Sequence, residues 1–402
     1  MVYLDYNASA PFPSEWPELS LDKIGALLRD SSANPSSLHR PGRKGRKIIN
    51  QTTDLVANFL NVDAEFLYWT SGASEANSFA LNSAYEFALS RRRQNPVFFI
   101  SAIEHESTLM AARAYEKKGV TIVTIPVDQD GVLKTEDLRT LLEQYTISHG
   151  GVDLVSVLYA NNETGVIQPY RKVGSLCKKF NVPFHMDCVQ GLGKRLLSIK
   201  GLQSEQDGPT YLTFSAHKIG GLKGLGFLVV QPFSVGQGKL LSAIVHGKQQ
   251  KSLRGGTENP FLIGIFGEVL KAISSGKSIF PEHLETWRRD FEAELTSRIP
   301  DTIIYGRAVN RICNTTYVGF PGAIDDSILV NLDLEGICAS SGSACTSGSI
   351  DPSHVLLAQG YDKDLARSSV RFSSGYGNTW ADFENVLDVL PKIVERVRAK
   401  KE

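Results

Sequence analysis

Short apolar runs that alternate with helical segments constrain the fold of this chain most strongly. Five runs have the length and composition of buried strands: PVFFI (96–100), VDLVSVLYA (152–160), VPFHMD (182–187), YLTFSA (211–216) and GFLVV (226–230). Segments with helical periodicity lie among them, at 75–89, 107–118, 134–145 and 171–180. Since strands that alternate with helices form parallel βαβ units, the pattern predicts an α/β fold whose mostly parallel sheet is covered on both faces.

The pattern changes after about residue 270. A long helical segment over 280–299 precedes the short strand-like runs TIIYG and TTYVGF, and further helical segments follow at 353–360 and 381–400. Mixed elements of this kind are typical of an α+β unit. We therefore expect a large α/β domain over 14–270 and a smaller α+β domain built from 1–13 and 271–402.

The composition excludes several classes of protein. Lysine plus arginine equals aspartate plus glutamate, at 43 each, so no nucleic-acid partner is indicated. No apolar segment approaches the ~18–20 residues of a membrane-spanning helix, and the start of the chain lacks the pattern of a secretory signal. The cysteine count is odd, no CxxC spacing occurs, and neither a disulfide framework nor a metal site is predicted: Cys177, Cys188, Cys313, Cys338 and Cys345. These features predict a cytoplasmic protein with thiols available for chemistry.

Polar residues follow the ends of the predicted strands, where α/β sheets bind their ligands. His105, Asn162 and Asp187 each come after an apolar run, and Lys218 follows the run YLTFSA. The small residues from Ser71 onward begin a helical pattern and suit either a phosphate site or a simple helix N-cap. Each feature alone has an ordinary structural explanation, such as a packed histidine or a surface lysine.

Together these groups match the needs of one cofactor, pyridoxal 5′-phosphate. A lysine amine forms a Schiff base with its aldehyde, and an aspartate keeps its pyridine nitrogen protonated. A helix N-terminus can hold its phosphate. Because the combination is far more specific than any one member, the sequence predicts an enzyme that uses this cofactor, with Lys218 and Asp187 in those roles.

The segment SSGSACTSGS, at 340–349, surrounds Cys345 with small residues that cannot form a core. We expect an exposed, mobile loop here. Its thiol is either incidental surface composition or a nucleophile that the loop carries to a partner.

Motifs along nearly the whole chain resemble those of the cysteine desulfurases, in the class V aminotransferase group of fold-type I pyridoxal-phosphate enzymes. The matching segments occur in family order: YLDYNASAP, ANPSSLHRPGRKGR, TSGASEAN, EHES, NNETGVIQP, HMDCVQG, SAHKIGG, RGGTEN, SSGSACTSG, DPSHVLLAQG and SSVRFSSG. The segment SSGSACTSG in front of DPSHVL is the most specific. It is similar to the segment in desulfurases that have a long catalytic-cysteine loop. The resemblance implies that the smaller domain carries this loop.

The resemblance implies a role for each matching residue. Lys218 would carry the cofactor, His105 would stack on its ring, and Cys345 would accept the sulfur of L-cysteine. The residues implied to hold the cofactor are Ala73, Ser74, Asn162, Asp187, Gln190, Ser215, His217, Lys218 and, reaching the phosphate of the other subunit, Thr257. The residues implied to bind the substrate are Arg371, Asn34 and Asn162. The resemblance also implies a homodimer with shared sites and a sulfur-acceptor protein, as in the supply of sulfur for iron–sulfur clusters.

Some segments depart from the family pattern. Ala8-Ser9-Ala10 stands in place of a threonine-rich element, Ala33 in place of a glycine, and residues 246–251 read HGKQQK. These changes leave open which protein accepts the sulfur. A selenocysteine lyase or a class V aminotransferase is an alternative activity, and a noncatalytic assembly protein that kept the fold is a further alternative.

Overall fold

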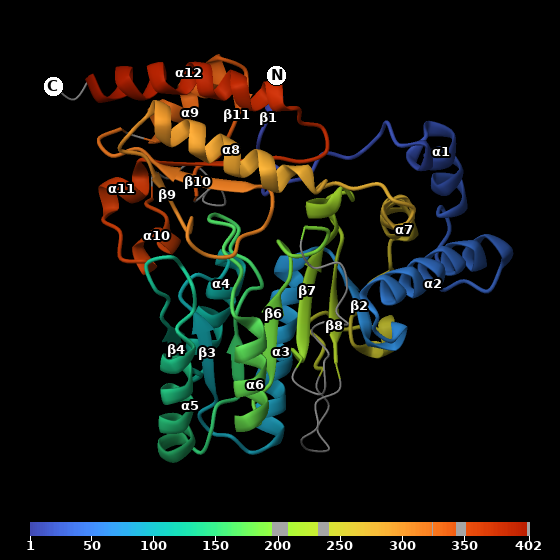
Figure 1. Ribbon diagram of the computed structural model, residues 1–402. Coiled ribbons are helices and arrows are strands. Elements are labelled where there is room, and N and C mark those ends of the chain that lie inside the picture. Colours follow the sequence, from blue (N-terminus) through green and yellow to red (C-terminus); the bar gives the residue numbers. More distant parts are fainter. Residues whose placement is uncertain (195–207, 232–240, 324, 343–350, 400–402) are drawn as a thin grey trace.

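The computed structural model describes residues 1–194, 208–231, 241–323, 325–342 and 351–399 (Figure 1). Its largest element is a seven-stranded sheet in the order β2-β8-β7-β6-β5-β3-β4. These strands are β2 Leu67–Thr70, β3 Val97–Ser101, β4 Thr121–Ile125, β5 Leu154–Ser156, β6 Phe184–Asp187, β7 Tyr211–Ser215 and β8 Gly226–Val230. The predicted α/β sheet is confirmed, although β4 was not identified from the sequence.

All neighbouring strands are parallel except where β8 pairs with β7 and with β2. Only residues 216–225 separate β7 from β8. A parallel crossover needs about a dozen residues or more, so this short connection makes the pair antiparallel. It also places the SAHKIGG turn directly at the carboxyl end of β7.

Helices cover both faces of the sheet, which explains the uninterrupted apolar runs. Phe98 and Ile100 pack in one core with α3 (Ala73–Ser90) and α4 (Glu106–Glu116). Val97 and Phe99 point to the opposite face because side chains alternate along a strand. They pack in a second core with α5 (Thr135–His149), α6 (Tyr170–Phe180) and parts of α2 (Arg40–Leu60) and α7 (Pro260–Ser274).

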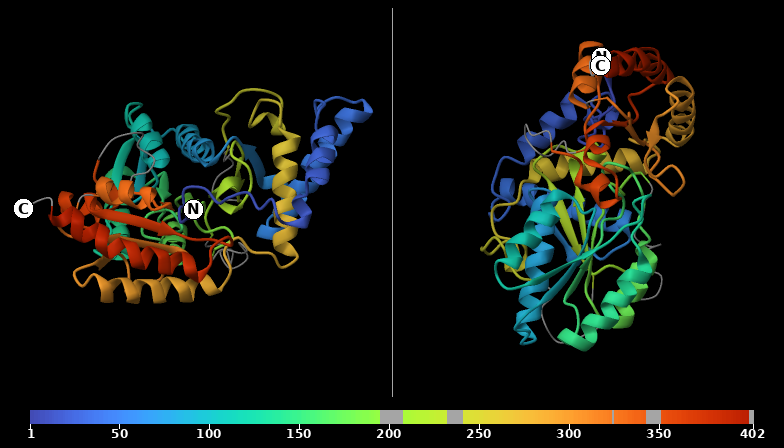
Figure 2. Two further views of the ribbon diagram at one scale, coloured as in Figure 1. Left: turned by 90° about the horizontal axis from the view of Figure 1, so that it is seen from above. Right: turned by 90° about the vertical axis from the view of Figure 1, so that its left-hand side faces the viewer.

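One group of helices, α1 (Leu21–Asp30), α2 and α7, gathers beside β2 and extends away from the rest of the molecule (Figures 1 and 2). Two glycines of α7 permit its close approach to the other two. A Cβ at Gly264 would meet Leu27 and Ile48, and a Cβ at Gly267 would meet Thr52. These helices were not identified from the sequence.

A second layer contains a three-stranded antiparallel sheet, β12-β10-β9, and a parallel pair, β1-β11. The strands are β1 Val2–Tyr3, β9 Ile303–Ile304, β10 Thr315–Gly319, β11 Ile337–Cys338 and β12 Ser369–Ser373. The helices are α8 His283–Arg298, α9 Asp325–Leu334, α10 His354–Ala358, α11 Lys363–Arg367 and α12 Trp380–Ala399. The first strand of the chain, β1, and the last helix, α12, both belong to this layer (Figure 1). The division into domains at residues 13 and 270 stays a prediction.

The predicted strand at 152–160 is longer than β5, which ends at Ser156. The chain nevertheless continues alongside β6, because Val157 N donates to His185 O (3.1 Å) and Tyr159 N donates to Asp187 O (2.8 Å). Among the described residues, no helix is both long and apolar enough to cross a membrane.

A buried ion pair joins α8 to the segment before β10. Arg311 donates from Nη1 and Nη2 to the carboxylate of Glu292, at 2.8 and 2.7 Å, and Thr316 Oγ1 donates to the same group at 2.9 Å. Glu292 is only 2% exposed. Because the pair is buried, removing one partner would leave the other charge in the protein interior without compensation.

Replacing Glu292 by alanine should destabilise the protein by about 3–5 kcal/mol, because the Arg311 guanidinium is left buried and unpaired. Urea denaturation measures this change. Glu294→Ala is the matched control on the same helix, since its pair with Arg298 is exposed and its removal should change stability by less than about 0.5 kcal/mol. Equal effects of the two substitutions would contradict the prediction.

Candidate active site

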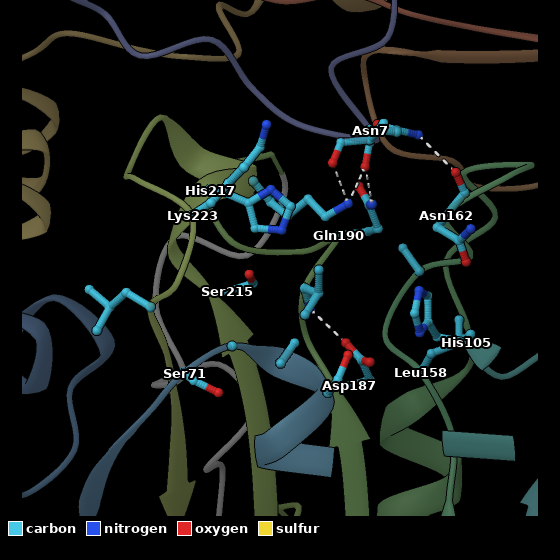
Figure 3. Close-up of a pocket in the computed structure, with 18 of the residues that line it drawn as sticks. Asn7, Ser71, His105, Leu158, Asn162, Asp187, Gln190, Ser215, His217 and Lys223 are labelled. Atoms are coloured by element: carbon cyan, nitrogen blue, oxygen red, sulfur yellow. Dashed lines mark hydrogen bonds between the residues drawn. The ribbon is translucent and has the colours of Figure 1, made fainter. Parts of the chain in front are cut away.

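A cavity of about 500 Å³ lies at the carboxyl ends of β3, β6 and β7 (Figure 3). Ten residues that were predicted from the sequence line it together: Ala73, Ser74, His105, Asn162, Asp187, Gln190, Ser215, His217, Lys218 and Arg371. Nine of them lie at or after the carboxyl ends of β2, β3, β5, β6 and β7, and Arg371 comes from β12. One cavity thus brings together most of the residues that the sequence predicted for the cofactor and the substrate.

Asp187 ends β6 and lies in the floor of the cavity, where it is 6% exposed. Its Oδ2 accepts a hydrogen bond from Asn77 Nδ2 of α3 at 2.9 Å, and its Oδ1 accepts one from Val189 N at 2.9 Å. These donors offset the cost of burying a carboxylate. The group is therefore available as an anionic partner for a ring nitrogen.

His105 is the N-cap residue of α4 and lines one side of the cavity. Its Nδ1 accepts a hydrogen bond from Ser107 N at 3.1 Å. Since that nitrogen accepts, the neutral imidazole carries its proton on Nε2. The cap thereby holds the ring at the position where the resemblance places a stacking partner.

Lys218 lies on the short helical turn η5 (Ala216–Ile219) that follows β7. Its Nζ donates to Asn7 O at 2.6 Å and to Ala8 O at 2.8 Å. A segment from the start of the chain therefore holds the amine in place. Asn7 and Ala8 line the cavity too, although neither was predicted as a site residue.

The start of α3 has the features of a phosphate site. Its N-cap residue is Gly72, which offers no side chain to the helix, and Ala73 and Ser74 of its first turn line the cavity. The N–H groups and dipole at such an end favour an anion. A Cβ at Gly226 would meet the backbone of Gly72, so glycine is needed for β8 to approach this turn.

His217 lies on the same side of the cavity and its Nδ1 is 3.3 Å from Ser9 Oγ. Burial, together with the nearby Lys218 and Lys223 ammonium groups, lowers its pKa to about 4. The imidazole is therefore neutral at pH 7. It can still donate a hydrogen bond to a phosphate oxygen.

Arg371 of β12 is 2% exposed and is held from two sides. Its Nη2 donates to Asp5 Oδ1 at 2.8 Å, and its Nη1 donates to Asn162 O at 3.0 Å. Within the described part of the chain, its buried Nε has no hydrogen-bond acceptor. The residue also lines the cavity, and a guanidinium there suits a carboxylate ligand.

These residues fit pyridoxal 5′-phosphate and an amino-acid substrate. The structure offers an amine, a carboxylate, an anion-binding helix end and a guanidinium within one cavity. The chemistry of this set matches the aldehyde, ring nitrogen and phosphate of the cofactor and the carboxylate of an amino acid.

Two predicted site residues, Asn34 and Thr257, are not brought into the cavity of this single chain. Asn34 is exposed, and its Oδ1 accepts from Ser36 N at 2.9 Å. Thr257 is also exposed and does not line the cavity. Cys345, and the prediction that 341–349 is a mobile loop, fall largely outside the described residues. Their roles stay predictions.

Gly342 lines the cavity, at the last described position before residue 343. A Cβ there would collide with the Tyr317 hydroxyl and the Glu163 carboxylate. Glycine at this position is thus required by a close approach. No pattern in the sequence predicted this contact; the segment shows only an abundance of small residues.

A buried polar network lies behind Asp187. Ser156 Oγ donates to Glu104 Oε1 at 3.0 Å and is 2.8 Å from His185 Nδ1. Burial and the Asp187 charge raise the pKa of Glu104 to about 8, against the opposing hydrogen bond from Ser156. Burial lowers the pKa of His185 to about 4. Both groups are therefore mainly neutral at pH 7.

Glu104→Gln should change how stability depends on pH. Between pH 4.5 and 8 the folded protein holds a proton on Glu104 that the unfolded chain has lost, so its free energy of unfolding falls as pH rises. This contribution has a slope of up to about 1.4 kcal/mol per pH unit, and glutamine removes it. Urea denaturation from pH 5 to about 8 measures the difference, with exposed Glu116→Gln of α4 as the control. Parallel curves for the wild type and Glu104→Gln would contradict the assignment.

Comparison with known proteins agrees with this geometry. The family model Aminotransferase class-V matches residues 2–386. "Cysteine desulfurase IscS" of Dictyoglomus turgidum is 35% identical over 402 aligned positions, covering 99% of this chain and 95% of that protein. "Cysteine desulfurase IscS" of Clostridium botulinum is 33% identical, with the same coverage.

Solved structures show the same similarity. A "NifS-like protein" superposes with a TM-score of 0.82 and 27% identity, covering 98% of this chain and 99% of that one. A structure titled "SspA in complex with cysteine" superposes with a TM-score of 0.76 and 26% identity, covering 93% and 99%. With the cavity described above, these similarities establish that the chain belongs to the class V aminotransferase family and, within it, to the cysteine desulfurases, whose cofactor is pyridoxal 5′-phosphate.

Proposed function

We propose that this protein removes the sulfur of L-cysteine, leaving L-alanine and a persulfide on Cys345. The observation that carries the proposal is the convergence of Lys218, Asp187 and Arg371 on one cavity. When bound, pyridoxal 5′-phosphate supplies an electron sink for the carbon next to the amino group.

The residues of the chain have separate tasks in this proposal. Arg371 binds the substrate carboxylate, and Asp187 keeps the ring nitrogen of the cofactor protonated. Lys218 moves a proton at the α-carbon. The Cys345 thiolate forms a bond to the substrate sulfur while the carbon–sulfur bond breaks, and the carbon fragment is protonated to alanine.

Mass spectrometry of the cysteine-treated holoenzyme tests this function. We expect one extra sulfur atom on the peptide that contains Cys345, and one alanine released for each sulfur gained in the first turnover. An extra sulfur on another residue would overturn the proposal. Turnover of selenocysteine that does not require Cys345, with no turnover of cysteine, would instead support a selenocysteine lyase.

A homodimer with shared sites is part of the proposal. Thr257 and Asn34 are exposed in the single chain and so are free to reach a second copy. On and near α1, the apolar side chains of Leu21 (86% exposed), Leu28 (56%) and Leu38 (87%) also face outward, as a subunit contact would require. Mixing Thr257→Ala subunits with Lys218→Ala subunits should restore one sound site per mixed dimer. Mixed dimers without recovered activity would refute shared sites.

The persulfide is proposed to pass to an acceptor protein that supplies iron–sulfur clusters or other thiolated products. The cytoplasm is the proposed location, because the reaction needs a free thiol and reducing compartments keep thiols available.

A further inference from the structure

A second lysine lies beside the cavity, and the roles proposed above do not use it. Lys194 follows Gln190 by one helical turn of sequence and is 7% exposed. Its Nζ donates to Asn7 Oδ1 at 2.6 Å and to Gln190 Oε1 at 2.5 Å, and lies 4.8 Å from the ring centroid of Phe280. Lysine is rarely buried this deeply, so its retention here calls for a physical reason.

Lysine can only donate hydrogen bonds, and this property fixes the direction of both amides. The oxygen of Gln190 must face Lys194, so its Nε2 faces away and donates to Asn7 O at 3.0 Å. The oxygen of Asn7 must also face Lys194. Its Nδ2 therefore donates to Asn162 O at 3.1 Å and to Thr315 Oγ1 at 2.8 Å.

Two carbonyl oxygens in this network, Asn7 O and Asn162 O, also accept hydrogen bonds from groups with proposed roles at the site. Asn7 O accepts from Lys218 Nζ, and Asn162 O accepts from Arg371 Nη1. Figure 3 shows Asn7, Gln190 and Asn162 joined above the cavity. The Lys194 amine is thus connected by hydrogen bonds, through Gln190 and Asn7, to the acceptors of Lys218 and Arg371.

We infer that Lys194 is a positioning residue that acts through Gln190 and Asn7 to set the hydrogen-bond directions around Lys218 and Arg371. This inference rests on the proposed use of the cavity by pyridoxal 5′-phosphate. A purely core-filling lysine would be replaceable by methionine, which has a similar length and packs well in apolar surroundings. A positioning lysine would not, because methionine lacks the N–H donors.

The hydrogen bonds around Lys194 predict the effect of its loss. Without the amine, Gln190 and Asn7 lose the donor that orients their side-chain oxygens. The acceptors of Lys218 and Arg371 would then be free to change direction. Loss of Lys194 should therefore shift the pH at which the lysine-bound cofactor takes up its proton.

A double-mutant cycle on the holoenzyme tests the inference, using Lys194→Met, Gln190→Ala and the combined variant. The measurements are the pH midpoint of the yellow absorbance of the bound cofactor and the cofactor dissociation constant. Lys194→Met should shift the midpoint by about half a pH unit and weaken cofactor binding about tenfold. Because Lys194 acts through Gln190, the combined variant should change no more than the larger single variant.

Thermal unfolding of the cofactor-free proteins separates positioning from simple packing. A Lys194→Met protein that unfolds at a lower temperature but keeps the wild-type midpoint and cofactor affinity overturns the inference, as do additive effects in the cycle. If Lys194→Met does not fold, Lys194→Gln replaces it in the same cycle, because glutamine keeps N–H donors on a shorter chain and should give an intermediate shift. A wild-type protein that forms no yellow complex dependent on Lys218 would overturn the use of the cavity as well.

Discussion

Lys218→Ala is expected to abolish alanine release from L-cysteine, lowering kcat by about 10⁴-fold or more. The amine is the only group that the structure places to bond the cofactor from the η5 turn, held by Asn7 O and Ala8 O. Weak cofactor binding should remain, because Ala73, Ser74 and the other phosphate-site residues are untouched. Alanine assay and dialysis against free cofactor measure the two results.

The matched control is Lys223→Ala, because Lys223 lines the same cavity but is exposed. Borohydride reduction should attach the cofactor covalently to this control as to the wild type, and not to Lys218→Ala. Full turnover by Lys218→Ala, or covalent attachment in it, would remove Lys218 from the mechanism.

Cys345→Ser should keep the bound cofactor and lose turnover almost completely, since a hydroxyl is a far poorer nucleophile toward sulfur than a thiolate. The other cysteines are poorly suited to replace it. Cys177, Cys188 and Cys313 are buried, and burial raises the pKa of the first two thiols. Alanine release and absorbance after addition of L-cysteine measure the loss of turnover and the retained cofactor.

Cys338→Ser is the control for this substitution, since Cys338 is the partly exposed thiol of β11, nearest in sequence to residue 345. It should retain wild-type turnover. A defect in Cys338→Ser equal to that in Cys345→Ser would mean that the sulfur does not reach Cys345 directly.

Local patterns predicted the parts of the site that follow strands. Asp187 and Lys218 were identified because each comes directly after a buried apolar run, and parallel strands bring their carboxyl ends to one edge. The direction of β8 was not identified, because the strand pattern carries no information on whether a ten-residue connection crosses over or turns back.

Asn7 and Lys194 were not assigned their roles, for a different physical reason. Asn7 has partners at 162, 190 and 315, and no local periodicity reports contacts between segments so far apart. Lys194 belongs to a residue type that is normally solvated, so its burial arises only from the packing of Phe280 and the first segment around it. Thr257 and Asn34 are proposed to act at the site of a second subunit, and patterns within one chain carry no information on contacts between copies.

The crossing of residues 5–8 over the cavity has a consequence for biosynthesis. Asp5 is made first, yet its partner Arg371 comes 366 positions later, and Asn7 waits 308 positions for Thr315. Contacts that close such long loops form late and slow the folding of a chain. A nascent chain that has reached residue 300 already carries Lys218 and the proposed phosphate site, but it lacks Arg371, which is proposed to bind the substrate carboxylate. Cofactor capture can therefore precede substrate recognition while the protein is still on the ribosome, and the completed chain seals the site last.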